Sequence, residues 1–157
     1  MSKKPVSKII GSGRAIPEKV MTNFDLEKMV DTSDEWIRTR TGIETRYVAA
    51  EGQCTSDLGS EAATNAMEDA GVSPEEIDAI IFATITGDVG FPATAIFVQK
   101  NIGAVNATAF DIAAACSGFI FGLDMADSLI STGRAKTVLV IGAETLSRIT
   151  DYTDRNT

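Results

Sequence analysis

Apolar residues gather in three short runs along the chain, at Ala79–Ile85, Thr108–Ile112 and Lys136–Gly142. Each run has the length of a strand. A nearly continuous apolar strand is typical of a parallel sheet that is covered on both faces. We also predict a strand at Val6–Gly13 and a strand or ribbon at Ile43–Ala49.

The stretches between these runs predict helices. The best defined helix spans Thr55–Ala70, where Leu58 and three alanines form one stripe and Gly71 supplies the stop signal. The other predicted helical segments are Asp25–Val30, a short helix capped by Ser33, Ser73–Glu76, Ala93–Asn101, and a helix from Cys116 to near Gly133. Strands that alternate with helices predict an α/β fold with a mostly parallel sheet. The end of the chain, residues 145–157, is polar and predicts no strand.

The segment Phe110–Gly122 combines the end of a strand, a turn of small residues and the start of a helix. Cys116 follows three alanines at this helix start, where free backbone N–H groups and the helix dipole favour a thiolate. The same N–H groups could hold an oxyanion after the sulfur attacks a carbonyl. The helix is apolar nearly all round as far as Asp124, which predicts that it is buried. The alternative interpretation of Cys116 is a small, buried core cysteine.

Composition narrows the class of protein. With 157 residues, 44% hydrophobic and 23% charged, the chain suits one globular domain. The net charge of −8 argues against nucleic-acid binding. No signal peptide and no apolar run of membrane-spanning length is present, which predicts no membrane association. Two cysteines make no disulfide framework, so we predict a cytoplasmic protein. Cys54 is not preceded by a turn of small residues, so we interpret it as an incidental thiol.

The chain contains no histidine. A cysteine nucleophile normally relies on a neighbouring histidine or another base. The chain therefore cannot form a Cys–His pair by itself, which makes a cysteine hydrolase the weakest of the enzyme interpretations.

The pattern Asp-x-Ala-Ala-Ala-Cys-Ser-Gly-Phe at Asp111–Phe119 resembles the nucleophile turn of the β-ketoacyl-[acyl carrier protein] synthase III family, in the thiolase superfamily. Three other segments match the family in order, so the resemblance covers the whole chain. They are Thr32–Ile37 with Arg40–Ile43, Phe91–Pro92, and Gly142–Glu144 through Asp154–Arg155. The resemblance implies that residues 1–157 form the N-terminal half of a thiolase-like fold, which has five αβαβα layers in the full-length protein. It also implies that the chain ends in a loop before the last strand of this half, and that the C-terminal half is absent.

The resemblance further implies the initiating condensing enzyme of type II fatty-acid synthesis. Such an enzyme joins an acyl-CoA primer to malonyl-acyl carrier protein by a decarboxylating Claisen condensation, through an acyl-Cys116 intermediate. Acyl-CoA is then a substrate, and no cofactor or metal is implied. We expect a homodimer. In the family a His and an Asn from the second half assist decarboxylation, so this chain alone is expected to be inactive in condensation.

By the same resemblance, two groups of residues contact the substrate. Thr32, Trp36, Arg40 and Arg155 would bind coenzyme A, with Trp36 stacking on adenine. Ile85, Phe91 and Leu146 would border the acyl pocket, with Phe91 crossing the dimer interface. Without the resemblance, Trp36 and Phe91 are explained as core residues and Arg155 as a solvated loop charge.

Two other functions stay open at this point. One is a related acyltransferase or ketosynthase of secondary metabolism, which has the same fold and another substrate. The other is a non-catalytic fragment that binds coenzyme A or dimerises, in which Cys116 is never acylated.

Overall fold

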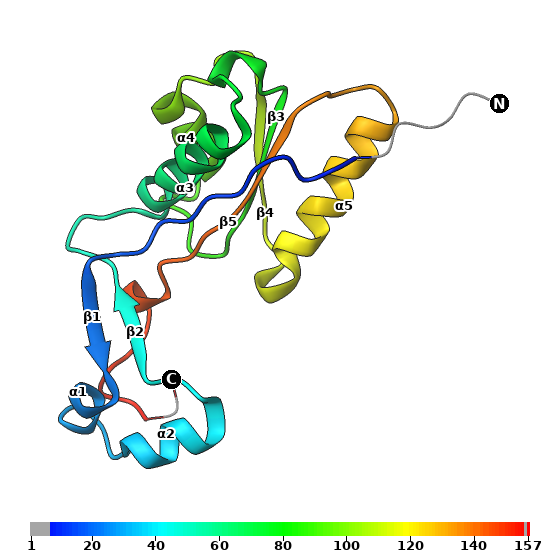
Figure 1. Cartoon of the computed structure of the whole chain (residues 1–157). Helices are drawn as coiled ribbons and strands as arrows, with labels where there is room; N and C mark the ends of the chain where they lie inside the picture. The colour runs from blue at the N-terminus through cyan, green and yellow to red at the C-terminus, as the bar shows by residue number, and fades with distance from the viewer. Residues whose placement is uncertain (1–6, 156) are drawn as a thin grey trace. The chain divides into compact units, whose positions relative to one another are not determined.

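A computed structural model describes residues 7–155 and 157 and divides the chain into two compact units (Figure 1). The α/β unit contains the N-terminal segment up to Ala15 and residues 54–144. The hairpin unit contains residues 16–53 and 145–157.

The α/β unit is built on a parallel sheet of three strands in the order β4-β3-β5. The central strand β3 (Ala79–Ala83) is buried along its whole length, and β4 (Thr108–Ile112) and β5 (Val138–Gly142) flank it. Ala83 lies opposite Ile112 on one side and Gly142 on the other, so the three strands end at the same edge. The three apolar runs and their parallel arrangement are therefore confirmed.

Helices cover both faces of this sheet (Figure 1). On one face lie α3 (Thr55–Ala70) and α4 (Thr94–Ile102), which end at left-handed glycines 71 and 103 as predicted. A 3₁₀ turn, η1 (Pro74–Glu76), leads into β3. The core consists of Ala63, Met67, Ile77, Ile80, Phe82, Ala95, Val98, Ala104, Ala107 and Ile141. None of the helices within residues 7–155 combines the length and apolar character that a bilayer crossing requires.

On the other face lies α5 (Gly118–Ser131), and here the prediction of a buried helix is wrong for the described chain. Only Gly118, Gly122 and Ala126 of this helix are buried. These small residues recur every fourth position, so they form one narrow stripe that packs against the sheet. Four large apolar side chains outside that stripe are exposed, whereas Leu123, Leu129 and Ile130 are half-buried. The four exposed side chains are those of Phe119, Ile120, Phe121 and Met125.

The small-residue stripe leads to a stability prediction. A Cβ atom at Gly118 would lie 2.9 Å from the Cβ of Ala83 in the central strand, and neither atom can rotate away. Gly118→Ala is therefore expected to lower the free energy of unfolding by roughly 1–3 kcal/mol. Denaturant unfolding would measure this loss. Gly90→Ala is the control, since a Cβ there meets nothing within 4 Å; equal stability of the two variants would contradict the packing argument.

The N-terminal segment does not form the strand predicted at Val6–Gly13. Val6 lies outside the described residues, and residues 7–13 show no strand pairing. Their glycines pack against α3 instead: a Cβ at Gly11 would lie 2.6 Å from the carbonyl oxygen of Ala66. Ser7 Oγ also donates to Asp127 Oδ1 of α5 at 2.5 Å. The segment is thus held by helices on both sides, and a groove of about 520 Å³ separates it from β5.

The hairpin unit starts with an antiparallel pair, β1 (Lys19–Thr22) and β2 (Thr45–Val48). The ribbon predicted at Ile43–Ala49 corresponds to β2, whereas β1 was not predicted. Two short helices, α1 (Asn23–Glu27) and α2 (Asp34–Thr41), connect the strands and confirm the predictions there. In the second part of this unit, the described residues form a 3₁₀ turn, η3 (Leu146–Arg148), and no strand, as expected.

Thr22 forms the cap of α1. Its backbone N–H and hydroxyl both donate to the Asp25 carboxylate, at 3.0 and 2.6 Å. These bonds lower the pKa of Asp25 from 3.8 to about 2, and the bond from the hydroxyl has the larger effect. Because the folded pKa lies below the unfolded one, this cap stabilises the fold above about pH 4 and is lost as the pH falls through about 2.

Candidate active site

The candidate nucleophile lies where β4 passes into α5. The strand ends at Ile112, three alanines follow, and Cys116 is the middle residue of a 3₁₀ turn, η2 (Ala115–Ser117), directly before α5. The thiol is exposed. The interpretation of Cys116 as a buried core cysteine is therefore wrong for this chain.

Ala115 holds this turn in a strained conformation. Its φ is +44°, and among the described residues it is the only non-glycine residue with a positive φ. A left-handed backbone costs a residue with a side chain roughly 1–3 kcal/mol and is often found at functional sites. Here it allows the chain to change direction within one residue and to present the Cys116 sulfur at the surface.

Three segments of the chain meet at the carboxyl edge of the sheet, next to this turn. The first continues from β3, and Thr84 N donates to Ile112 O at 3.1 Å. The second carries Cys116. The third continues from β5, and Ala143 N donates to Ala83 O at 3.3 Å. Ligands of open α/β sheets bind outside the carboxyl ends of the strands, so Cys116 lies at the edge where a substrate is expected.

Glu144 connects two of these segments. Its Oε1 accepts from Ile85 N at 2.9 Å, and its Oε2 accepts from Thr86 N at 3.0 Å and from Thr84 Oγ1 at 3.1 Å. The hydroxyl of Thr86 donates to Oε2 as well. Sequence reasoning missed this role. The available signal was a lone carboxylate placed directly after an apolar strand.

Two predicted acyl-pocket residues belong to the α/β unit and are exposed. Ile85 follows β3 and is 52% exposed; Phe91 precedes Pro92 through a cis peptide bond and is 90% exposed. The interpretation of Phe91 as a core residue is thus wrong for this chain. The third predicted residue, Leu146, belongs to the hairpin unit.

Asp111 belongs to the cysteine motif, but its side chain binds the N-terminus of α4. Its carboxylate accepts from the backbone N–H groups of Thr94 and Ala95, at 2.6 and 2.8 Å. A carboxylate at a helix N-terminus satisfies free N–H groups and interacts well with the helix dipole. Asp111 therefore fixes the start of α4 beside β4.

The hairpin unit contains a pocket of about 390 Å³. Three of the four residues predicted to bind coenzyme A line it, namely Thr32, Trp36 and Arg155, and Leu146 lines it too. The fourth, Arg40, does not line the pocket but lies over the ring of Trp36, which does.

Trp36 is the centre of a cationic cluster. The residue is 43% exposed, and the guanidinium carbons of Arg40 and Arg155 lie 4.8 and 4.9 Å from the centroid of its ring. At these distances both cations are attracted to the indole ring. Trp36 is thus no core residue, and Arg155 is more than a solvated loop charge. An aromatic ring beside two guanidinium groups suits a ligand that joins a flat base to phosphate.

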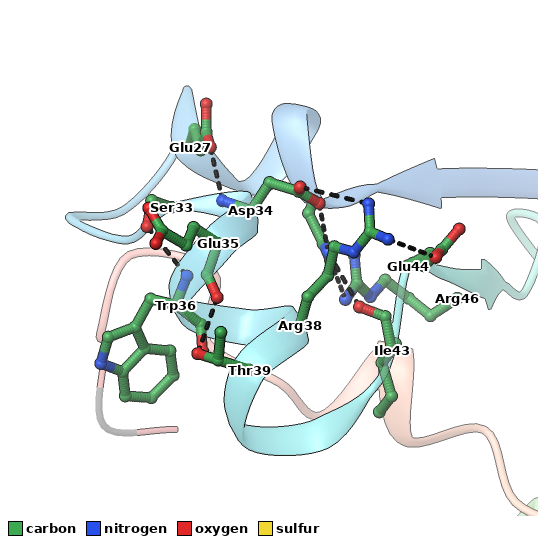
Figure 2. Close-up of polar contacts among 11 residues, drawn as sticks. Glu27, Ser33, Asp34, Glu35, Trp36, Arg38, Thr39, Ile43, Glu44 and Arg46 are labelled. Atoms are coloured by element: carbon green, nitrogen blue, oxygen red, sulfur yellow. Dashed lines mark hydrogen bonds and ion pairs between the residues drawn. The ribbon is translucent and has the colours of Figure 1, made fainter.

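Trp36 belongs to α2, and side-chain contacts hold this helix in place (Figure 2). Ser33 Oγ caps the helix by accepting from Trp36 N at 3.1 Å. Arg38 connects α2 to the ribbon, with its nitrogens 3.7 Å from Asp34 Oδ2 and 2.9 Å from Glu44 Oε1. In Figure 2 the indole ring points away from these contacts.

Asn23 is fully buried and joins the parts of this unit. Its amide donates to Asp34 Oδ1 and to Ile43 O, both at 2.8 Å, and its oxygen accepts from Arg46 at 2.7 Å. Because all these bonds converge on one side chain, α1, α2 and β2 are held as one body and the Trp36 platform is preformed.

The described residues contain no cluster of three or more His, Cys, Asp or Glu side chains that could hold a metal ion.

Comparison with known proteins agrees with this architecture. A family model described as 3-Oxoacyl-[acyl-carrier-protein (ACP)] synthase III matches residues 110–157. Over all 157 residues, the chain is 58% identical to the β-ketoacyl-[acyl-carrier-protein] synthase III of Caldanaerobacter subterraneus, and it covers 47% of that protein. The corresponding protein of Geobacillus kaustophilus is 58% identical over 149 residues, which are 95% of this chain and 48% of the relative.

Solved structures show the same fold. The 3-oxoacyl-[acyl-carrier-protein] synthase III of Aquifex aeolicus is 56% identical with a TM-score of 0.92, over 96% of this chain and 48% of that one. The priming β-ketosynthase of the R1128 polyketide pathway is 34% identical with a TM-score of 0.94, over 99% of this chain and 46% of that one.

The parallel sheet, its helices and the cysteine turn define a thiolase-like α/β protein. Over its whole length, the chain is similar to members of the β-ketoacyl-[acyl-carrier-protein] synthase III family. It spans about half the length of the curated relatives it matches.

Proposed function

We propose that the chain is the nucleophile-bearing, N-terminal half of an enzyme that starts type II fatty-acid synthesis, by condensing an acyl-CoA primer with malonyl-acyl carrier protein. The observation that supports this most directly is the exposed Cys116 on a strained turn at the carboxyl edge of the sheet. The names of the most similar relatives support the same reaction.

In the first step, the Cys116 thiolate attacks the carbonyl carbon of the acyl-CoA thioester. The carbonyl oxygen becomes an oxyanion that the Cys116 backbone N–H helps to stabilise. When the intermediate collapses, its C–S bond to coenzyme A breaks. The products are acyl-Cys116 and the coenzyme A thiolate, which takes up a proton.

The hairpin unit would hold the nucleotide end of the substrate. Trp36 offers an exposed ring for the adenine, and the guanidinium groups of Arg40 and Arg155 suit phosphate. Both guanidiniums already lie by the ring, so adenine would displace at least one of them. Thr32 contributes a hydroxyl to the same pocket.

In the second step, malonyl-acyl carrier protein loses carbon dioxide, and the resulting carbanion attacks the acyl-Cys116 carbonyl. The Cys116 thiolate leaves, and a β-ketoacyl product remains on the carrier protein. The sequence contains no histidine. We therefore assign the His and Asn that assist decarboxylation to the second half of the protein.

The partners follow from the same proposal. The carrier protein is acidic, and this chain has a net charge of −8, so we place its basic docking site in the second half. The exposed Phe91 and the large apolar side chains of α5 suit contacts with that half and with a second copy in a homodimer. We assign the enzyme to the cytoplasm.

A ketosynthase of secondary metabolism is supported less well. The polyketide priming enzyme shares 34% of its residues with this chain, against 58% for the fatty-acid synthase III relatives. A higher identity over a comparable length favours the fatty-acid substrate.

A fusion protein provides the test. In this chimera, the 157 residues replace the matching part of the Caldanaerobacter relative. The chimera is expected to release a β-ketoacyl product from acyl-CoA and malonyl-acyl carrier protein, whereas the 157-residue chain alone is expected to give no sustained product, because it lacks histidine. Product analysis by mass spectrometry measures both. Turnover by the 157-residue chain alone would contradict the assignment of the His and Asn to the second half of the protein. A chimera that folds but is inactive would contradict the proposed function.

A further inference from the structure

We propose that Glu144 is a positioning residue that sets which primer chain length Cys116 accepts, by fixing the turn that carries Ile85. This inference rests on the proposed function, because it concerns the acyl group that Cys116 would receive.

The contacts of Glu144 are concentrated on one short turn. The half-buried carboxylate, at the end of β5, accepts from two consecutive backbone N–H groups after β3, those of Ile85 and Thr86. The hydroxyls of Thr84 and Thr86 donate to the same carboxylate. Four donors from three residues therefore converge on one side chain that lies about 60 positions away in the sequence.

Ile85 continues the strand whose last residue packs beside the nucleophile turn. It follows Ala83 by two residues, and Ala83 is the residue on which Gly118 packs. Gly118 in turn follows Cys116 by two residues. The Ile85 side chain has no polar group and is half exposed, so the backbone bonds to Glu144 decide where it lies.

Replacing the carboxylate by an amide tests this dependence. Glutamine has nearly the same shape as glutamate, but its side chain has one acceptor oxygen and an NH₂ donor. It can accept from Ile85 N or from Thr86 N, but it cannot accept from both through separate oxygens. Thr86 N also donates to Thr84 Oγ1 at 3.1 Å, so it keeps an acceptor in either orientation of the amide. When the oxygen stays with Thr86 N and the two threonine hydroxyls, the NH₂ group faces Ile85 N. The turn is then expected to shift until the N–H of Ile85 finds another partner, and Ile85 moves with it.

The experiment compares the rates at which acetyl-, butyryl-, hexanoyl- and octanoyl-CoA acylate Cys116 in the chimera, followed by intact mass. Glu144→Gln is expected to change the ratio of short-chain to long-chain kcat/KM by about 10-fold, the scale of one or two methylene groups in an apolar pocket. In an Ile85→Ala background, Glu144→Gln is expected to change the ratio no further.

Asp111→Asn is the matched control, because Asp111 also accepts from two backbone N–H groups at this edge but supports α4. It is expected to change all four rates by a common factor. A ratio in Glu144→Gln within about twofold of the parent would overturn the proposal, since a merely structural carboxylate behaves like Asp111. If Glu144→Gln does not fold, Thr86→Val replaces it, because this variant removes one of the hydroxyl donors to the carboxylate. A changed ratio of short-chain to long-chain rates would again support the proposal, and a ratio within about twofold of the parent would overturn it. If the parent chimera is not acylated at all, the proposed function fails first and Glu144 with it.

Discussion

Cys116→Ala is expected to reduce acyl transfer from acyl-CoA in the chimera by a factor on the order of 10³ or more. The substitution removes the sulfur that is proposed to hold the acyl group, while the turn and its backbone N–H groups remain. Alanine is also small enough for the exposed position. The measurement is the acylated mass of the protein and the rate of product formation.

Cys54→Ala is the control for this experiment. Cys54 is the second thiol of the chain; it is half-buried and lies at the N-cap of α3. Its replacement is expected to leave acylation within about twofold of the parent, because no small-residue turn presents it to a substrate. An acylated mass that survives Cys116→Ala and disappears with Cys54→Ala would transfer the nucleophile to Cys54.

Trp36→Ala is expected to weaken coenzyme A binding by roughly 10- to 100-fold. Stacking of a base on an aromatic side chain contributes about 1–3 kcal/mol, and each 1.4 kcal/mol is a factor of ten. The loss is expected in the KM for acyl-CoA, with kcat nearly unchanged, since the nucleotide is bound in the ground state and in the transition state alike. Calorimetric titration with coenzyme A gives the Kd directly.

Two variants separate stacking from other effects of this substitution. Trp36→Phe keeps a ring and is expected to recover much of the affinity. Phe24→Ala removes an aromatic side chain of α1 that is 60% exposed and does not line the pocket. It is expected to bind coenzyme A as the parent does. Equal affinities for Trp36→Ala and Phe24→Ala would exclude Trp36 from the nucleotide site.

The sheet was predictable because its signal is local. An apolar run of strand length at Ala79–Ile85 leaves few alternatives to a buried parallel strand, and β3 occupies most of it. Strand β1 has no such signal, because Lys19–Thr22 is short, partly polar, and stabilised by pairing with β2 about 25 residues later. The helix α5 was predicted as buried because apolar composition does not reveal which face meets the sheet; the stripe of small residues decides that.

The candidate site was predictable in part for the same reason. Cys116 stands out because a run of small residues surrounds it, and Arg40 follows Trp36 by four positions, one turn of a helix. Arg155 reaches Trp36 across more than a hundred residues, and only family resemblance indicated it. The bonds of Glu144 to the turn after β3 depend on the register of two strands, which no local pattern encodes.

Because Ala115 has a left-handed backbone, a substitution that raises the thermal stability of this protein can lower its activity. Glycine adopts such a backbone without strain, so Ala115→Gly relieves the turn in the folded state. Glycine also widens the range of directions in which the neighbouring thiol can point. A library ranked by heat resistance alone would therefore reward the change that loosens the nucleophile, which is the trade-off common to strained active sites. Engineering of this protein for stability should hold residue 115 fixed and select elsewhere.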